Sequence, residues 1–217
     1  MAVHAVGEMK RPSSQVAIGI DEVGRGALAG PVVVVAAAII RTARFATELG
    51  TLKDSKKLTV KQRERWYAHF VTHPQIFFAI ARVYPRQIEK RNISQAANLA
   101  AKRALGRLAT KGGSARSNTK IFLDGGLYLG NRGEQAAKFP TAKTIIKADE
   151  TIPAVAVASI IAKVYRDRFM TKLAKQYPAY SFEIHKGYGT KIHREAIREN
   201  GPCDVHRLTF LGKLNTL

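Results

Sequence analysis

The chain has 217 residues, and its 36 lysines and arginines outnumber 16 aspartates and glutamates, which gives a net charge of +20 at pH 7. This excess indicates a polyanionic partner, and 46% hydrophobic residues favour one compact domain over a disordered basic chain. The single cysteine, Cys203, excludes an internal disulfide and a thiolate zinc cluster, so a reducing compartment, the cytoplasm, is expected. The most apolar stretch, 32–40, is far shorter than the roughly 20 residues of a membrane span, so no membrane partner is expected.

The first elements in chain order are strands. Residues 1–15 have no apolar core and are expected to form a flexible tail, followed by one domain over 16–217. Strands are predicted at 16–23, 32–40 and 76–84, because these segments are rich in β-branched, aromatic or alanine residues.

Two helices are predicted around the third strand. Thr59 and Gln62 form a capping box that starts the first helix, and Pro74 ends it. The second helix is predicted to begin with Ser94 as its N-cap and to continue to about Ala109.

The second half of the chain adds a loop at 111–118, strands at 121–124 and 141–147, and a long helix at about 153–176 that starts with a proline. Asp149 lies just beyond the last strand. This order of elements predicts an α/β domain with a mixed β-sheet flanked by helices and a small helical C-terminal extension.

The long helix is expected to be amphipathic. Its apolar side would include Ile160, Ile161, Val164 and Phe169. The basic residues Arg166, Arg168, Lys172 and Lys175 are expected to form a solvated face, with some of them in contact with nucleic acid.

Two adjacent acids, Asp21 and Glu22, end the first strand and are followed by Gly24, Arg25 and Gly26. Neighbouring strand residues point to opposite faces, so both acids can serve one site only if the strand ends or kinks there, which the glycines allow. Carboxylate oxygens suit Mg²⁺, and the Arg25 fork or the glycine amides suit a phosphate. A solvated turn with two surface acids is the alternative.

Acids follow three predicted strands: Asp21 with Glu22, then Asp124, then Asp149. Strand ends of α/β sheets gather ligands at one edge, so these carboxylates are expected to converge. A cluster of four carboxylates needs cations, which predicts two divalent metals about 4 Å apart. Taken singly, Asp124 could be a turn acid and Asp149 a helix-start acid.

These segments resemble the ribonuclease HII family, the type 2 ribonucleases H. The similarity extends from Ile18 to about Phe210 and rests on several motifs in the family's order. They are G-I-D-E at 19–22, G-R-G at 24–26, D-S-K-K-L at 54–58, L-D-G at 123–125, K-A-D at 147–149, G-Y-G-T at 187–190 and H-R-L-T-F at 206–210. Ala148 and Thr209 depart from the glycine and serine common in relatives, and neither is a proposed metal ligand.

The resemblance implies a ribonuclease H-like catalytic domain and an endonuclease that cuts the RNA strand of RNA/DNA hybrids. It also implies cleavage 5′ of a single ribonucleotide embedded in duplex DNA, leaving a 3′-hydroxyl and a 5′-phosphate. Two divalent ions, Mg²⁺ or Mn²⁺, would be the cofactors. By the same resemblance, the catalytic metal-binding acids would be Asp21, Glu22, Asp124 and Asp149.

The resemblance also implies substrate-binding residues. Gly24, Arg25 and Gly26 would sense the ribose 2′-hydroxyl, which distinguishes RNA from DNA. Tyr188 would stack on the sugar of the following deoxynucleotide. Backbone phosphates would be held by Ser55, Lys56 and Lys57.

Each assignment has a simpler alternative. Lys56 and Lys57 could be a solvated turn before a helix, and Tyr188 a packed loop aromatic. Three histidines match no zinc spacing and are expected to be structural or solvent-facing: His185, His193 and His206.

Two other functions remain open for the whole chain. One is a non-catalytic basic nucleic-acid-binding protein, which gives no reason for acids after three strands. The other is a junction-resolving nuclease of the same fold, which leaves Gly24, Arg25, Gly26 and Tyr188 unexplained. A monomer is expected in either case.

Overall fold

The structure, a computed structural model, describes residues 16–40, 43, 45, 49, 52, 55–110 and 119–212. The predicted tail at 1–15 and the predicted loop at 111–118 lie outside these residues.

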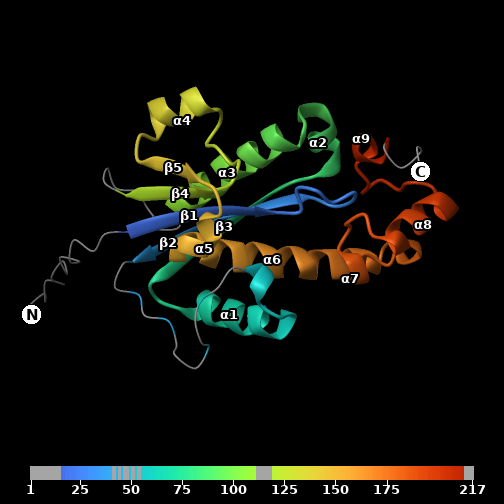
Figure 1. Ribbon diagram of the computed structural model, residues 1–217, viewed down its shortest axis with the longest axis horizontal. Helices are drawn as coiled ribbons and strands as arrows, with labels where there is room; N and C mark the ends of the chain where they lie inside the picture. Colours follow the sequence, from blue (N-terminus) through green and yellow to red (C-terminus); the bar gives the residue numbers. More distant parts are fainter. Residues whose placement is uncertain are drawn as a thin grey trace, which may run out of the picture.

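A five-stranded mixed sheet forms the centre of the fold, with strand order β3-β2-β1-β4-β5 (Figure 1). The strands are β1 (Val16–Val23), β2 (Val32–Ile40), β3 (Ile76–Val83), β4 (Lys120–Asp124) and β5 (Ala142–Ile145). Strand β2 pairs antiparallel with β1 and β3, whereas β1–β4 and β4–β5 are parallel. The predicted mixed sheet is therefore confirmed.

Helices cover both faces of this sheet. They are α1 (Val60–Thr72), α2 (Pro85–Arg91), α3 (Ile93–Thr110), α4 (Arg132–Lys138), α5 (Ala148–Thr151), α6 (Pro153–Ala174), α7 (Phe182–His185), α8 (Lys191–Asn200) and α9 (Leu208–Leu211). Helix α3 packs on one face and α6 on the other, with α1 beyond α6 (Figure 1). Helices α7 to α9 follow the end of α6 and form the predicted small C-terminal part.

Local signals explain where the helices begin. The hydroxyl of Thr59 accepts a hydrogen bond from the Gln62 amide, and the Gln62 side chain accepts one from the Thr59 amide, so the predicted capping box is present. The prediction of Ser94 as an N-cap is wrong. Helix α3 starts at Ile93, two residues before the start that this prediction implies, and Asn92 caps it by accepting from the Gln95 amide at 3.0 Å.

The core places α6 directly against the central strand. Strand β2 is buried along nearly its whole length, and β1 carries Gly19 where a Cβ would lie 2.1 Å from the Ala154 carbonyl carbon. Only a glycine permits this close approach, and it brings the start of α6 beside β1. None of the described helices is long and apolar enough to cross a membrane.

Candidate active site

Three aspartates from separate elements meet at one edge of the sheet. Strands β1 and β4 are parallel neighbours, and Ile20 pairs with Leu123, so Asp21 and Asp124 follow each other across the ladder. One oxygen each from Asp21, Asp124 and Asp149 lies within 4.8 Å of the others. The convergence expected from the sequence is therefore present for these three side chains.

Asp149 reaches this group through a turn rather than a strand end. Strand β5 ends at Ile145, two residues before the predicted end at Lys147, whose backbone has a left-handed φ of 57°. The chain then enters the short helix α5, and the Ala148 amide donates to Asp124 Oδ1 at 2.7 Å. This bond ties α5 to β4 and turns Asp149 back toward the sheet edge.

Burial and like charge disfavour the ionised form of these acids when no cation is bound. Burial raises the pKa of Asp21 well above its ordinary value, and the charges of Glu22 and Asp124 raise it further. Burial also raises the pKa of Glu22, although the Arg25 guanidinium opposes this shift. The buried Glu22 Oε2 has no hydrogen-bond partner among the described residues. Three converging aspartates, with the orphaned Glu22 oxygen as a neighbour, fit hard divalent cations, whose preferred ligands are carboxylates and water.

The predicted phosphate-binding segment lies at the rim of these acids. Lys56 Nζ lies 3.6 Å from Asp149 Oδ2, and Lys57 Nζ lies 3.1 Å from Glu150 Oε2. The Ser55 side chain is buried, and its hydroxyl lies 2.9 Å from the Ser159 hydroxyl, facing the interior rather than solvent. The lysines are thus exposed and Ser55 is not.

The glycine-flanked loop after β1 rests on a buried cation. Gly24 has a φ of +83°, and a Cβ on it would lie 2.1 Å from Arg166 Nε, so only glycine fits there. Arg25 is half-buried and contacts Glu22 Oε1 at 3.3 Å and Ser94 Oγ at 2.8 Å. The loop therefore holds its arginine between the acidic group and α3.

Two fully buried arginines hold this loop in place, and sequence reasoning missed both. Arg207 donates to the carbonyls of Gly24, Arg25 and Gly30 at 2.7 to 3.1 Å. The expectation that Arg166 belongs to a solvated face is wrong, because its exposed fraction is 0%. It donates instead to the carbonyls at positions 29, 31 and 186. Burial lowers the pKa of Arg207 to about 9, with the Arg166 charge adding to the effect.

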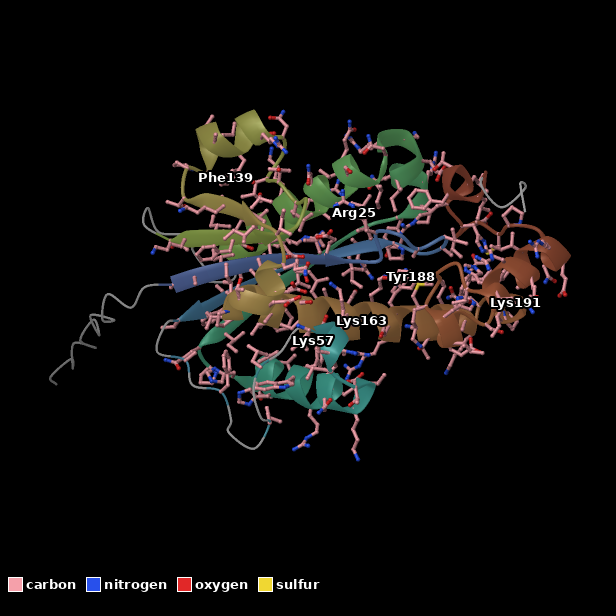
Figure 2. All side chains as sticks on the ribbon, in the orientation of Figure 1. Arg25, Lys57, Phe139, Lys163, Tyr188 and Lys191 are labelled. Carbon is pink, nitrogen blue, oxygen red and sulfur yellow. The ribbon has the colours of Figure 1, made fainter. Side chains whose placement is uncertain are left out.

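The Tyr188 segment joins the same assembly. The Gly187 carbonyl accepts from the Leu28 and Ala29 amides at 2.8 and 3.2 Å, and the Arg166 guanidinium lies 5.3 Å from the centroid of the Tyr188 ring. In Figure 2, Arg25, Tyr188 and Lys57 are drawn in the middle of the view, with Tyr188 between the other two in height. The two segments predicted to contact substrate are thus one connected unit.

Figure 2 also shows Lys163, a residue that the sequence motifs did not single out, between Lys57 and Tyr188 in this view. It lies on α6, is partly buried, and pairs with Asp167 at 2.8 Å.

The three late histidines are buried, so of the two expected alternatives, structural or solvent-facing, the structure supports the structural one. His193 and His206 contact each other through their Nε2 atoms at 3.1 Å, and the His185 ring stacks on that of His193 at 4.2 Å. Burial lowers the pKa of all three, that of His193 to about 4. They form a structural cluster apart from the aspartates.

Comparisons with known proteins show the family to which the chain is similar. The profile of the family described as Ribonuclease HII matches residues 18–213. Ribonuclease HII of Coxiella burnetii (strain Dugway 5J108-111) is 42% identical over 93% of this chain and 91% of its own length. That of Fusobacterium nucleatum is 44% identical over 91% of this chain and 86% of its own.

Solved structures show the same fold. The ribonuclease H2 of Pyrococcus horikoshii OT3 superimposes with a TM-score of 0.69 and 27% identity, covering 93% of this chain and 98% of that one. The Archaeoglobus fulgidus ribonuclease HII, solved in complex with PCNA, has a TM-score of 0.69 at 26% identity, covering 89% and 94%. Bst-RNase HIII in complex with Mn²⁺ has a TM-score of 0.66 at 26% identity, covering 87% and 63%.

The profile match over most of the chain, the relatives above 40% identity and the shared ribonuclease H-like fold lead to one assignment. The chain belongs to the ribonuclease HII family and is a hydrolase of the ribonuclease H type, an endonuclease.

Proposed function

We propose that this enzyme cuts the RNA strand of RNA/DNA hybrids and cleaves 5′ of a single ribonucleotide in duplex DNA, leaving a 3′-hydroxyl and a 5′-phosphate. The observation that carries the proposal is the buried acidic group, with the orphaned Glu22 Oε2, beside a loop built from Gly24, Arg25 and Gly26. The family assignment supports the hydrolytic activity, and the loop supports the ribonucleotide specificity.

Two divalent ions, Mg²⁺ or Mn²⁺, would be held by Asp21, Glu22, Asp124 and Asp149. When bound, such ions lower the pKa of water and neutralise charge that develops on the leaving oxygen. The protein's own contribution is to fix the carboxylates: the Ala148 amide anchors Asp124, and the Glu22 amide donates to Asp21 at 2.7 Å. The Mn²⁺ complex of the RNase HIII relative supports this choice of metals.

The loop after β1 would recognise the ribose. Arg207 engages the carbonyls of Gly24 and Arg25, whereas the amides of Arg25 and Gly26 have no acceptor among the described residues. Amides of this kind can donate to a 2′-hydroxyl or to a phosphate oxygen, and the 2′-hydroxyl is the group that DNA lacks.

The neighbouring residues would hold the flanking DNA. Tyr188 would stack on the sugar of the next deoxynucleotide, where a 2′-hydroxyl would interfere. Lys56 and Lys57 would contact backbone phosphates. Because the Ser55 hydroxyl faces Ser159, we assign Ser55 the role of positioning these lysines.

The test is cleavage of a labelled DNA duplex that carries one ribonucleotide, measured with Mg²⁺, Mn²⁺ or EDTA. An all-DNA duplex and a four-way DNA junction serve as controls. Metal-dependent cutting only on the 5′ side of the ribonucleotide is expected. Binding without cutting under every metal would favour a basic nucleic-acid-binding protein, and faster cutting of the junction would favour a junction-resolving nuclease.

A further inference from the structure

A groove of about 560 Å³ lies between α1, the edge strand β3 and α6, apart from the acidic group. Its walls carry three aromatic rings and three cations, and no carboxylate is among the residues that line it. These six residues are Tyr67, Arg82, Tyr165, Arg168, Phe169 and Lys172.

Arg82 has no polar partner in this groove. Its guanidinium carbon lies 5.6 to 5.8 Å from the ring centroids of Tyr84, Tyr165 and Phe169. Among the described residues it makes no ion pair and no hydrogen bond, although its side chain is exposed. A cation held over aromatic rings without a counterion is available to an anionic ligand.

The other cations extend the same surface. Arg168 lies 4.5 Å from the centroid of the Tyr67 ring and pairs with Glu64 at the margin of the groove. Lys172 is exposed and has no ion pair among the described residues. Aromatic rings alternating with cations in a concave surface suit unpaired bases and their phosphates, whereas a duplex presents a convex surface.

Helix α6 connects the groove to the acidic group. Ser159 lies beside the Asp21 side chain, and Arg168 and Lys172 lie nine and thirteen residues further along the helix. At 1.5 Å per residue these positions are ~14 and ~20 Å away. A strand advances ~3.4 Å per nucleotide, so the groove lies about four to six nucleotides from the acids.

We propose that this groove binds an unpaired single strand of nucleic acid that continues from the duplex being cut. The occupant is identified by charge complementarity and by the three partly exposed rings, because aromatic rings take bases regardless of sequence. The cleavage arm of its test rests on the proposed function, whereas the binding arm does not.

The binding arm uses fluorescein-labelled dT12 and measures anisotropy in EDTA at fixed salt. The Arg82→Gln/Lys172→Gln variant is expected to bind dT12 about ten-fold more weakly than the wild type. A matched control, Lys191→Gln/Arg198→Gln, loses the same charge from α8 and should bind as the wild type does. If dT12 binding is weakened equally in both double variants, the proposal is overturned, because the loss then depends only on the net charge of the protein.

Lys172→Gln alone guards against a folding artefact, because Lys172 is exposed and makes no ion pair among the described residues. It is expected to weaken dT12 binding about three-fold with unchanged Tm. Unchanged dT12 binding in both Lys172→Gln and the groove double variant would also overturn the proposal.

The cleavage arm compares blunt duplexes carrying one ribonucleotide with the same duplexes bearing an eight-nucleotide dT tail at either end. For the wild type, one tailed substrate should have a KM about five-fold lower than the blunt duplex. The groove double variant should not show this difference, and its kcat/KM on the blunt duplex should equal that of the wild type. An equal gain from a double-stranded extension would contradict a single-strand site. If no duplex is cut, the proposed function fails, and dT12 binding still decides the groove.

Discussion

The protein buries two clusters of metal-binding residue types, and they differ in how their polar atoms are satisfied. In the acidic cluster, defined as Asp21, Glu22, Asp124 and Asp149, the three aspartates meet within 4.8 Å, the charge of Glu22 acts on Asp21, and Glu22 Oε2 has no partner among the described residues. In the histidine cluster, defined as His185, His193 and His206, all six ring nitrogens have partners.

The histidine contacts specify neutral rings. His193 Nδ1 donates to the Tyr188 carbonyl, so its Nε2 accepts from His206 Nε2, and His206 Nδ1 accepts from the Cys203 amide. A closed set of this kind leaves no lone pair for a cation. Residue types alone therefore do not make a metal site. Carboxylate oxygens without hydrogen-bond partners favour a bound cation, whereas ring nitrogens that already have partners do not.

The largest effect is expected from neutralising one acid. Asp21→Asn or Asp124→Asn should lower kcat by at least about 10³-fold, several kcal/mol, because metal affinity is lost. Binding of the hybrid should remain, since repulsion between carboxylates and phosphate also falls. Single-turnover cleavage and hybrid binding measure the two effects separately.

The exposed Glu199→Gln change is the control for this first experiment, and its cleavage rate should match the wild type. Thermal unfolding adds a second readout. Mg²⁺ or Mn²⁺ at a hundred-fold excess over Kd should add about 2.7 kcal/mol to the free energy of unfolding of the wild type and so raise its Tm, and it should raise the Tm of Asp21→Asn much less. Undiminished cleavage in both acid variants would refute the metal assignment.

The histidine cluster should respond to protons where the acidic cluster responds to metals. Burial lowers the pKa of His193 from 6.5 to about 4. The unfolded chain therefore takes up a proton below pH 6.5 and the folded chain does not, so stability is full above 6.5 and is lost as pH falls toward 4. At pH 5 the loss should be about 2 kcal/mol.

Urea unfolding at pH 7.5 and pH 5 checks this value. His193→Asn keeps an amide donor for the Tyr188 carbonyl but cannot titrate, so its stability should change less between the two pH values. Comparing the two proteins cancels the other ionisable groups. An identical pH dependence in both would show that His193 is not the group responsible.

Much of the fold could be predicted because its signals are local. The bounds of β1 and β2 match the prediction, since buried β-branched runs end at turn residues, and the Thr59 capping box starts α1 as expected. The convergence of Asp21 and Asp124 follows from parallel strands.

The parts that were missed depend on partners distant in sequence. Arg166 can be buried because the carbonyls of residues 29, 31 and 186 accept hydrogen bonds from its guanidinium. These acceptors are distant in sequence, so no local pattern predicts the burial. Short helices α2 and α4 lack a long apolar period. The left-handed turn at Lys147, which directs Asp149, cannot be predicted from a strand pattern either.

A smaller effect is expected at Tyr188, where the histidine cluster meets the substrate-binding unit. Tyr188→Ala should lower kcat/KM on a single embedded ribonucleotide about ten-fold, because a stacking contact is worth ~1–3 kcal/mol. Cleavage of a long hybrid should change less. Tyr188→Phe keeps the ring and should restore most of the activity, whereas an unchanged preference in Tyr188→Ala would count against its role.

The smallest effect is expected from Cys203→Ser, at the end of the histidine chain. The thiol lies 3.2 Å from His206 Nδ1, but the Cys203 backbone amide already donates to that nitrogen at 2.9 Å and stays in the variant. Burial raises the pKa of Cys203, so the thiol is neutral and a poor metal ligand. Unfolding free energy should fall by less than about 1 kcal/mol. A larger loss, or zinc bound by the wild type and not by the variant, would mean that the histidine cluster, like the acidic one, needs a cation.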